Sequence, residues 1–197
     1  MNTRLLQAAA NHIENLSEWV GRSIAWLTIF MAATTFSIVV LRYVFDTGWI
    51  WLQESVTFMH ALVFMIGASY TLKHNGHVRV DIFYRGMSLR KKALVDLLGS
   101  LLLLLPMFIF IVWTSWEYVV VSWGLHEGSR EAGGLPGVFL LKTAIVIMAF
   151  LMLLQGLAMA INSLLILLNV DISPEPPRIC GREPDAPWNE VSPPPPE

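Results

Sequence analysis

Residues 97–116 read LLGSLLLLLPMFIFIVWTSW, a run that contains no charged side chain. A membrane span uses about 20 apolar residues, because the hydrocarbon core of a bilayer is about 30 Å thick. This run is the centre of an apolar segment near 88–122, and three further apolar segments lie near 23–41, 49–72 and 136–169. The sequence therefore predicts an all-α integral membrane protein with four transmembrane helices.

The composition fits this class and excludes several others. Of the 197 residues, 55% are hydrophobic and 14% are charged, whereas an ordinary soluble domain has about 25% charged residues. The net charge of −2 shows no basic excess of the kind that nucleic-acid binders carry. The single cysteine, Cys180, excludes an intramolecular disulfide framework and any Cys-rich metal site. Four spans and their connections leave no room here for a separate soluble catalytic domain.

Two of the predicted helices are longer than a vertical crossing needs. The segment near 88–122 would be about 50 Å long at 1.5 Å per residue, so we expect it to tilt or to protrude. Pro106 should bend this helix by freeing the carbonyl of Leu102. The fourth helix is introduced by Gly133-Gly134-Leu135-Pro136, a turn followed by a proline suited to a first helical turn.

The chain divides into three parts. Residues 1–21 form an amphipathic segment with an apolar stripe of helical period, made of Leu5, Ala9, Ile13, Leu16 and Val20. This segment either lies in the membrane interface or simply extends the first span, and the sequence leaves both open. Residues 22–169 are the four-helix transmembrane domain. Residues 170–197 are proline-rich and predict an extended or disordered polar tail.

The distribution of basic residues predicts the orientation. Ten of the 13 Lys and Arg residues fall before the first span, in the second connection and in the tail. Cytoplasmic loops carry such an excess. Both termini are therefore expected in the cytoplasm, and the third connection, with Glu127 and Glu131, on the opposite side.

Ionisable and polar residues inside the predicted spans are costly and need an explanation. Glu54 lies about one turn into the second span. We expect it to pair with Arg42 at the end of the first span or with a partner subunit, and a proton or cation site is the alternative. His60 is expected to hydrogen-bond another helix, since a haem would need a second, opposed histidine. Gln155 and Asn162 are seven residues apart and share a helix face. Such residues usually join helices, and a substrate path is the alternative.

Other motifs are absent or weak. Residues 77–84 alternate apolar and polar side chains and predict an ordered interfacial segment. The sequence has no phosphate-binding glycine loop, no zinc motif and no supported nucleophile–histidine pair. It also lacks the inverted repeat of many self-sufficient transporters. We therefore expect no enzyme activity, cofactor or metal, and a small four-span accessory or anchor subunit.

A set of short motifs in a fixed order goes further. They are Arg42-Tyr43-Val44-Phe45, Trp51-Leu52-Gln53-Glu54, Gly67-Ala68, His77-Val78-Arg79-Val80-Asp81, Glu127-Gly128-Ser129 and Gly134-Leu135-Pro136. In this order and spacing the chain resembles the small membrane subunit (DctQ-like) of tripartite ATP-independent periplasmic (TRAP) transporters over about residues 15–168. The Gly133-Gly134-Leu135-Pro136 motif, with Lys142 and Leu154-Gln155-Gly156, looks most like the branch associated with 2-oxo acids, mannitol and chloroaromatic acids.

The resemblance implies a role in sodium-coupled uptake of organic acids across the bacterial inner membrane. In that family a periplasmic binding protein captures the substrate and a large permease subunit carries it, while the small subunit braces the permease and helps to receive the binding protein. The family-motif and structural or interface residues would be Arg42, Trp51, Glu54, Gly67, His77, Asp81, Glu127, Ser129, Pro136 and Gln155. The alternatives are a four-helix membrane anchor of a redox complex, supported by His60, and a small self-sufficient oligomeric transporter.

Overall fold

The computed structural model describes residues 3–77, 84 and 86–168, and every regular element in these ranges is helical. The elements are α1 (Thr3–Val44), α2 (Ile50–Lys73), α4 (Leu89–Gly99), the π-helical turn η1 (Ser100–Leu104), α5 (Leu105–Gly124) and α6 (Val138–Leu167). Helices α1, α2, the continuous rod α4–η1–α5, and α6 are each long and apolar enough to cross a membrane. The prediction of an all-α protein with four such helices is confirmed.

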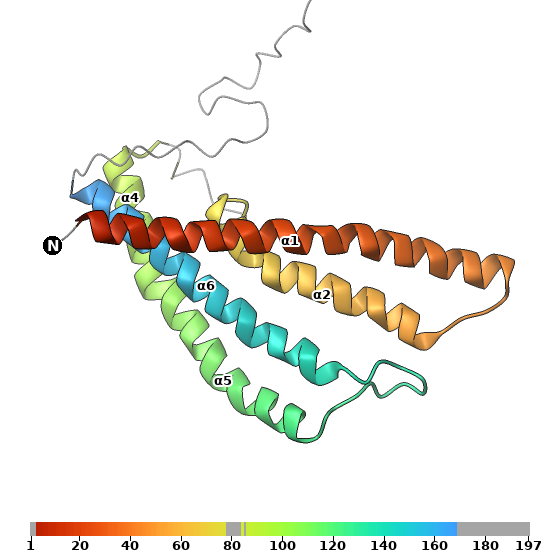
Figure 1. Ribbon diagram of the computed structural model, residues 1–197. Helices are drawn as coiled ribbons and strands as arrows, with labels where there is room; N and C mark the ends of the chain where they lie inside the picture. Colours follow the sequence, from red (N-terminus) through yellow and green to blue (C-terminus); the bar gives the residue numbers. More distant parts are fainter. Residues whose placement is uncertain (1–2, 78–83, 85, 169–197) are drawn as a thin grey trace, which may run out of the picture.

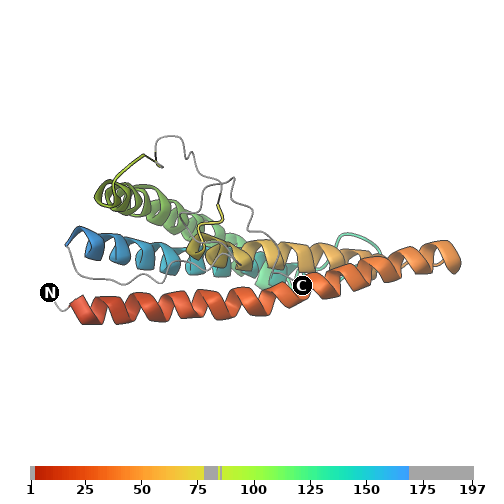
Figure 2. The ribbon, with the colours of Figure 1, turned by 90° about the horizontal axis from the view of Figure 1, so that it is seen from above.

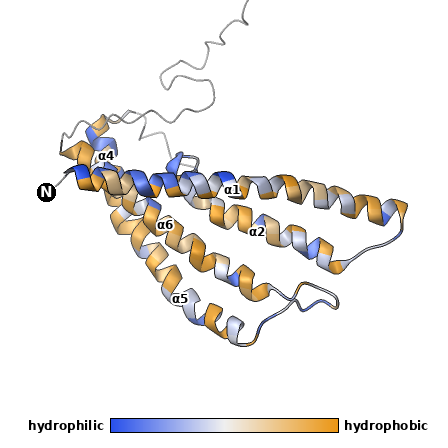
Figure 3. Cartoon of the chain, viewed as in Figure 1, coloured by the Kyte–Doolittle hydropathy of each residue, from blue (hydrophilic) through white to orange (hydrophobic). Residues whose placement is uncertain are grey.

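Helix α1 is continuous over 42 residues, which corresponds to about 63 Å at 1.5 Å per residue. Residues 3–21 therefore belong to the same unbroken helix as the first predicted span. Figure 3 shows that the hydrophilic residues of α1 gather in its N-terminal half and that the rest of the helix is mostly hydrophobic.

The third membrane helix contains a widened turn just before its proline. The Leu105 amide bonds the Ser100 carbonyl five residues earlier, and Pro106 follows within the first two positions of α5. A proline ring clashes with the carbonyl four residues before it, which here is Leu102, and a π-helical turn separates these groups. Figure 1 shows α4 and α5 meeting at an angle, so the bend is present and takes the form of a π-helical turn.

The start of the fourth helix differs from the prediction. Helix α6 begins at Val138, with Gly137 as the residue before it. Pro136 thus lies ahead of the helix rather than in its first turn. The turn itself is where it was expected, because Gly133 adopts a φ of +82°, a conformation that favours glycine.

The helices are close together at one end and fan out toward the other (Figure 1). We call the end that holds the start of α1, the end of α2, α4 and the end of α6 the terminal end. The opposite end, with connections 45–49 and 125–137, is the loop end. Helix α6 contacts α1, α2, α4 and α5, and Figure 2 shows it between α1 and the α4–α5 rod.

The best-packed part of the molecule lies toward the terminal end. Ala10 of α1 and Ala158 and Leu165 of α6 have no exposed surface. In α1 the buried residues are Ala10, Ser17 and Gly21, all in its N-terminal half. Beyond Gly21, α1 is therefore covered only partly by the rest of the chain.

Two glycines allow neighbouring helices to approach closely. A Cβ atom built on Gly21 of α1 would overlap the ring and Cβ of Tyr70 in α2. A Cβ atom on Gly156 of α6 would overlap the end of the Leu104 side chain in η1. These positions fix the spacing of α1 against α2 and of α6 against the third membrane helix.

Candidate functional site

Glu54 fastens the third connection to α2. Its Oε1 accepts a hydrogen bond from the Ser129 hydroxyl, and its Oε2 accepts one from the Leu135 amide at 2.6 Å. The expected Arg42–Glu54 ion pair is not formed among the described residues, because Arg42 is exposed at the end of α1 while the carboxylate turns toward 129–135. The prediction of this pair is wrong: Glu54 holds a loop rather than a neighbouring charge.

The loop that Glu54 holds is also bonded to itself. The Ser129 amide donates to the Leu135 carbonyl at 2.9 Å, and the Gly134 amide donates to the Glu131 carbonyl at 3.0 Å. A Cβ atom on Gly134 would lie 2.5 Å from Ser129 Cβ and 2.7 Å from Glu54 Oε2, so glycine leaves room for the carboxylate. The tip, residues 130–133, stays exposed. The result is a fixed loop with an accessible tip.

A second carboxylate, Glu127, fastens the loop to α5 and α6. It forms an ion pair with Lys142 and accepts a hydrogen bond from the Ser122 hydroxyl at 2.7 Å. The Lys142 ammonium also lies 3.8 Å from the centre of the Tyr118 ring, a cation–π contact. Hydrogen bonding from Lys142, and then from Ser122, holds the pKa of Glu127 below its usual range.

Polar side chains join α6 to α1 at the terminal end. The buried Ser17 hydroxyl donates to Gln155 Oε1 at 2.7 Å, and the Asn162 amide donates to Glu14 Oε1 at 2.6 Å. Gln155 and Asn162 do share one face, as their spacing indicated. The interpretation that they join helices is confirmed.

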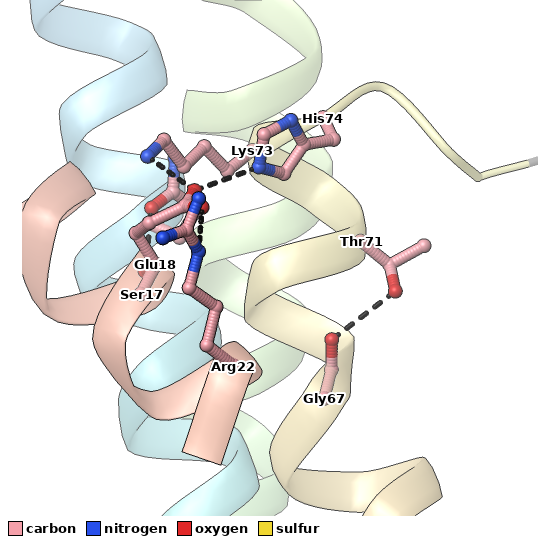
Figure 4. Close-up of polar contacts among 8 residues, drawn as sticks. Ser17, Glu18, Arg22, Gly67, Thr71, Lys73 and His74 are labelled. Atoms are coloured by element: carbon pink, nitrogen blue, oxygen red, sulfur yellow. Dashed lines mark hydrogen bonds and ion pairs between the residues drawn. The ribbon is translucent and has the colours of Figure 1, made fainter. Parts of the chain in front are cut away.

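A further polar cluster joins α1 to the end of α2 (Figure 4). Lys73 Nζ and His74 Nε2 lie 2.9 and 2.8 Å from Glu18 Oε2, and Arg22 Nε lies 2.9 Å from Glu18 Oε1. This cluster was not predicted from the sequence. The four-residue spacing of Glu18 and Arg22 could have predicted their ion pair, because residues at this spacing are neighbours on a helix.

The remaining predicted residues do not meet in one place. Trp51 is exposed at the loop end, and its ring stacks on that of Trp49 with 6.2 Å between the ring centroids. Pro136 lies against Gly128, where a Cβ atom would be 3.4 Å from the proline Cα.

Three further positions belong to the second span and the connection after it. A Cβ atom on Gly67 would be 3.9 Å from Ile24 of α1, an ordinary contact. His77 is exposed, and Asp81 lies outside the described residues, as do the rest of 78–83 and the predicted tail. Most of the interfacial segment expected at 77–84 thus lies outside the described residues.

The described residues show neither the hydrogen bond expected for His60 nor a metal site. His60 is exposed on α2, and the expected hydrogen bond to another helix is not formed within the described ranges. Among the described residues, no group of three or more His, Cys, Asp and Glu side chains could hold a metal ion. The polar groups that do come together fasten helices and a loop to one another.

The chain is similar to known proteins of one family. Residues 20–165 match the family "Tripartite ATP-independent periplasmic transporters, DctQ component". Over 95 residues the chain is 30% identical to the C4-dicarboxylate TRAP transporter small permease protein DctQ of Vibrio cholerae serotype O1 (strain ATCC 39315 / El Tor Inaba N16961). That match covers 48% of this chain and 40% of the Vibrio protein. No solved structure matches the chain.

The family match extends over all four helices long enough to cross a membrane, and it includes the residues that fasten the 125–137 loop. The family is a transporter component, which points to a role other than catalysis. The chain belongs to the DctQ component family of tripartite ATP-independent periplasmic transporters.

Proposed function

We propose that this chain is the small scaffold subunit of a sodium-coupled importer of organic acids in the bacterial inner membrane. It braces a large permease subunit and helps to dock a periplasmic substrate-binding protein. Both termini face the cytoplasm and the loop end faces the periplasm, as the distribution of Lys and Arg indicates. Family membership supports the tripartite assembly.

The observation that supports the scaffold role is the spreading of the helices from the terminal end toward the loop end. Large apolar side chains stay exposed along α1 beyond Gly21 and along α5, among them Ile29, Phe36, Val39, Met107, Ile109 and Phe110. Lipid covers part of such a surface, and a second membrane subunit would cover the rest. Helices that are joined at one end and spread at the other offer a broad, stationary face to a neighbour.

The docking role is supported by the loop at 125–137. A loop that contacts a partner binds better when its conformation is already fixed, because less entropy is lost on binding. Hydrogen bonds to Glu54 and from Ser122 to Glu127 hold this loop against the helices, while Arg130 and Glu131 at its tip are exposed. The tip is therefore the contact that we assign to the binding protein.

Co-purification from the native host tests the proposal. An affinity tag on this chain should retain a large multi-span subunit and, when substrate is present, a periplasmic binding protein. A tagged chain that never retains a multi-span partner would contradict the scaffold role. A Soret absorption band in the purified material would instead favour the redox anchor, and uptake by vesicles that contain this chain alone would favour an independent transporter.

A variant of Glu54 separates scaffolding from ion coupling. Glu54→Gln should lower the yield of the assembled complex, because the loop is then held by a neutral amide. Complex that does assemble should keep the sodium dependence of wild-type transport. Assembled complex with altered sodium dependence would assign Glu54 to the ion pathway.

A further inference from the structure

Four side chains form an exposed row along α1. They are Trp19, Arg22, Trp26 and Phe30, at steps of three, four and four residues, which place them on one side of a helix. The tryptophans are 70% and 65% exposed, the phenylalanine is 63% exposed, and the Arg22 side chain is 78% exposed. The buried residues Ser17 and Gly21 lie on the opposite side, against α6 and α2.

Arg22 has hydrogen-bonding capacity left over. Its bond to Glu18 uses Nε, and a guanidinium carries four further N–H donors on its two terminal nitrogens. Figure 4 shows the Arg22 side chain reaching back toward Glu18, and most of that side chain is exposed. The outer part of the guanidinium can therefore bind a group that approaches from outside the bundle.

The depth of Arg22 in the membrane follows from its neighbours. Helix α2 ends at Lys73, whose ammonium contacts Glu18 one turn before Arg22. From Ser23 to Leu41, α1 contains no charged residue, while Glu14, Glu18 and Arg22 carry charges on the other side of this boundary. Arg22 therefore lies where the apolar surface of α1 ends, and tryptophans are enriched at that depth, at the level of lipid headgroups.

We propose that this row, which we call the Trp19–Arg22–Trp26 face, binds an anionic phospholipid of the leaflet nearest the terminal end. The Arg22 guanidinium binds the phosphate, Trp19 and Trp26 flank the headgroup and glycerol, and one acyl chain lies along Phe30. Guanidinium matches the geometry of a phosphate and forms two parallel hydrogen bonds with it.

The charges nearby favour an anionic headgroup over a zwitterionic one. Glu18 is the carboxylate that contacts Arg22, and it also contacts Lys73 and His74. Glu14, one turn earlier, accepts its hydrogen bond from Asn162 on the side of α6. A single carboxylate shared between Arg22 and Lys73, which are both cationic at neutral pH, leaves positive charge at the membrane surface beside Arg22.

Native mass spectrometry of the full chain in non-ionic detergent tests the proposal. The protein is incubated with equal amounts of dioleoyl phosphatidylglycerol and dioleoyl phosphatidylcholine, and the two bound adducts are compared. Wild type should prefer phosphatidylglycerol, and Arg22→Gln should reduce that preference about fivefold, the factor expected for one basic side chain near an anionic surface. Arg4→Gln, which removes the same charge from the exposed start of α1, is the matched control and should keep the preference.

Three outcomes would overturn the proposal. In the first, Arg22→Gln binds both lipids as wild type does. In the second, Arg4→Gln loses as much of the preference for phosphatidylglycerol as Arg22→Gln, which would indicate only a general effect of net charge. The third is loss of the preference in complex with the large permease subunit, which would show that a protein covers this face. Arg22→Lys is a second informative variant: it keeps the charge but not the two-bond geometry, and an intermediate preference would support phosphate binding at Arg22. Folding of each variant is checked by its thermal midpoint.

Discussion

The two ends of the bundle are held together in different ways. At the terminal end the helices touch through small buried residues such as Ala10 and Ala158, and hydrogen bonds run directly from helix to helix. At the loop end the helices fan out (Figure 1). Besides the direct α5–α6 bond from Trp123 to Thr143, the bonds of Glu54 and Glu127 reach the intervening loop. The terminal end therefore determines how the helices pack, and the loop end determines what surface the molecule presents.

The largest expected effect is on packing. Gly21→Ala places a methyl group against the ring and Cβ of Tyr70, so α1 and α2 must shift, at a cost of about 1–3 kcal/mol, the usual range for overpacking. The thermal midpoint in detergent measures this loss. Gly67→Ala is the control, because its added atom meets Ile24 at 3.9 Å. Equal losses in the two variants would show that the close approach at Gly21 is not important for stability.

The next effect concerns the buried bond between α1 and α6. Ser17→Ala leaves Gln155 Oε1 without its donor, and coupling energies of about 0.6 kcal/mol, up to about 1.7, are found for such bonds between membrane helices. A double-mutant cycle with Gln155→Leu measures the coupling through unfolding free energies. A coupling of zero would mean that the two side chains do not bond in the membrane.

At the loop end the expected effect is local. Glu54→Gln should increase amide exchange at Leu135 and its neighbours several-fold, because a neutral acceptor holds the amide less well than a carboxylate. The thermal midpoint should change little, since the helices pack elsewhere. Hydrogen–deuterium exchange of residues 125–137 measures the change, and Glu131→Gln at the exposed tip is the control. A global loss of stability in Glu54→Gln would remove the distinction between the two ends.

The smallest expected effect depends on pH. The pKa of Glu127 is lowered by its bonds to Lys142 and Ser122, so these bonds stabilise the loop above the ordinary glutamate pKa of about 4.3. The stabilisation is lost as the pH falls through the lower, folded-state value. Once the intrinsic pH dependence of amide exchange is corrected for, exchange of the 125–137 amides should thus rise at acid pH in wild type. In Glu127→Gln this rise should be smaller, and an unchanged pH profile in that variant would assign the effect to another group.

The helices were predictable from sequence because their signals are long and repetitive. Four apolar segments gave four helices, and the second, expected near 49–72, is Ile50–Lys73. The pairing of Gln155 and Asn162 with α1 was partly predictable, because two polar residues on one apolar face need partners. Which residues they would meet, Ser17 and Glu14, depends on how α1 and α6 pack and is not visible in either helix alone.

The partner of Glu54 was harder to predict for a physical reason. Arg42 is near it in sequence and opposite in charge, but a backbone amide and a hydroxyl from residues 129–135 satisfy the carboxylate instead. A backbone donor has no residue-specific signal. Gly134 was the available hint, since its missing side chain makes room for Glu54 Oε2, yet a glycine in a turn has simpler explanations.

The π-helical turn η1 also determines which side chains of α4 face α6. A turn that holds one residue more than an α-helical turn shifts the phase of the helix before it, because each residue of an α-helix turns it by about 100°. With η1 in place, the small Ala93 of α4 is buried. Winding the same residues as an uninterrupted α-helix would rotate α4 by about 100° relative to α5 and take Ala93 out of that position.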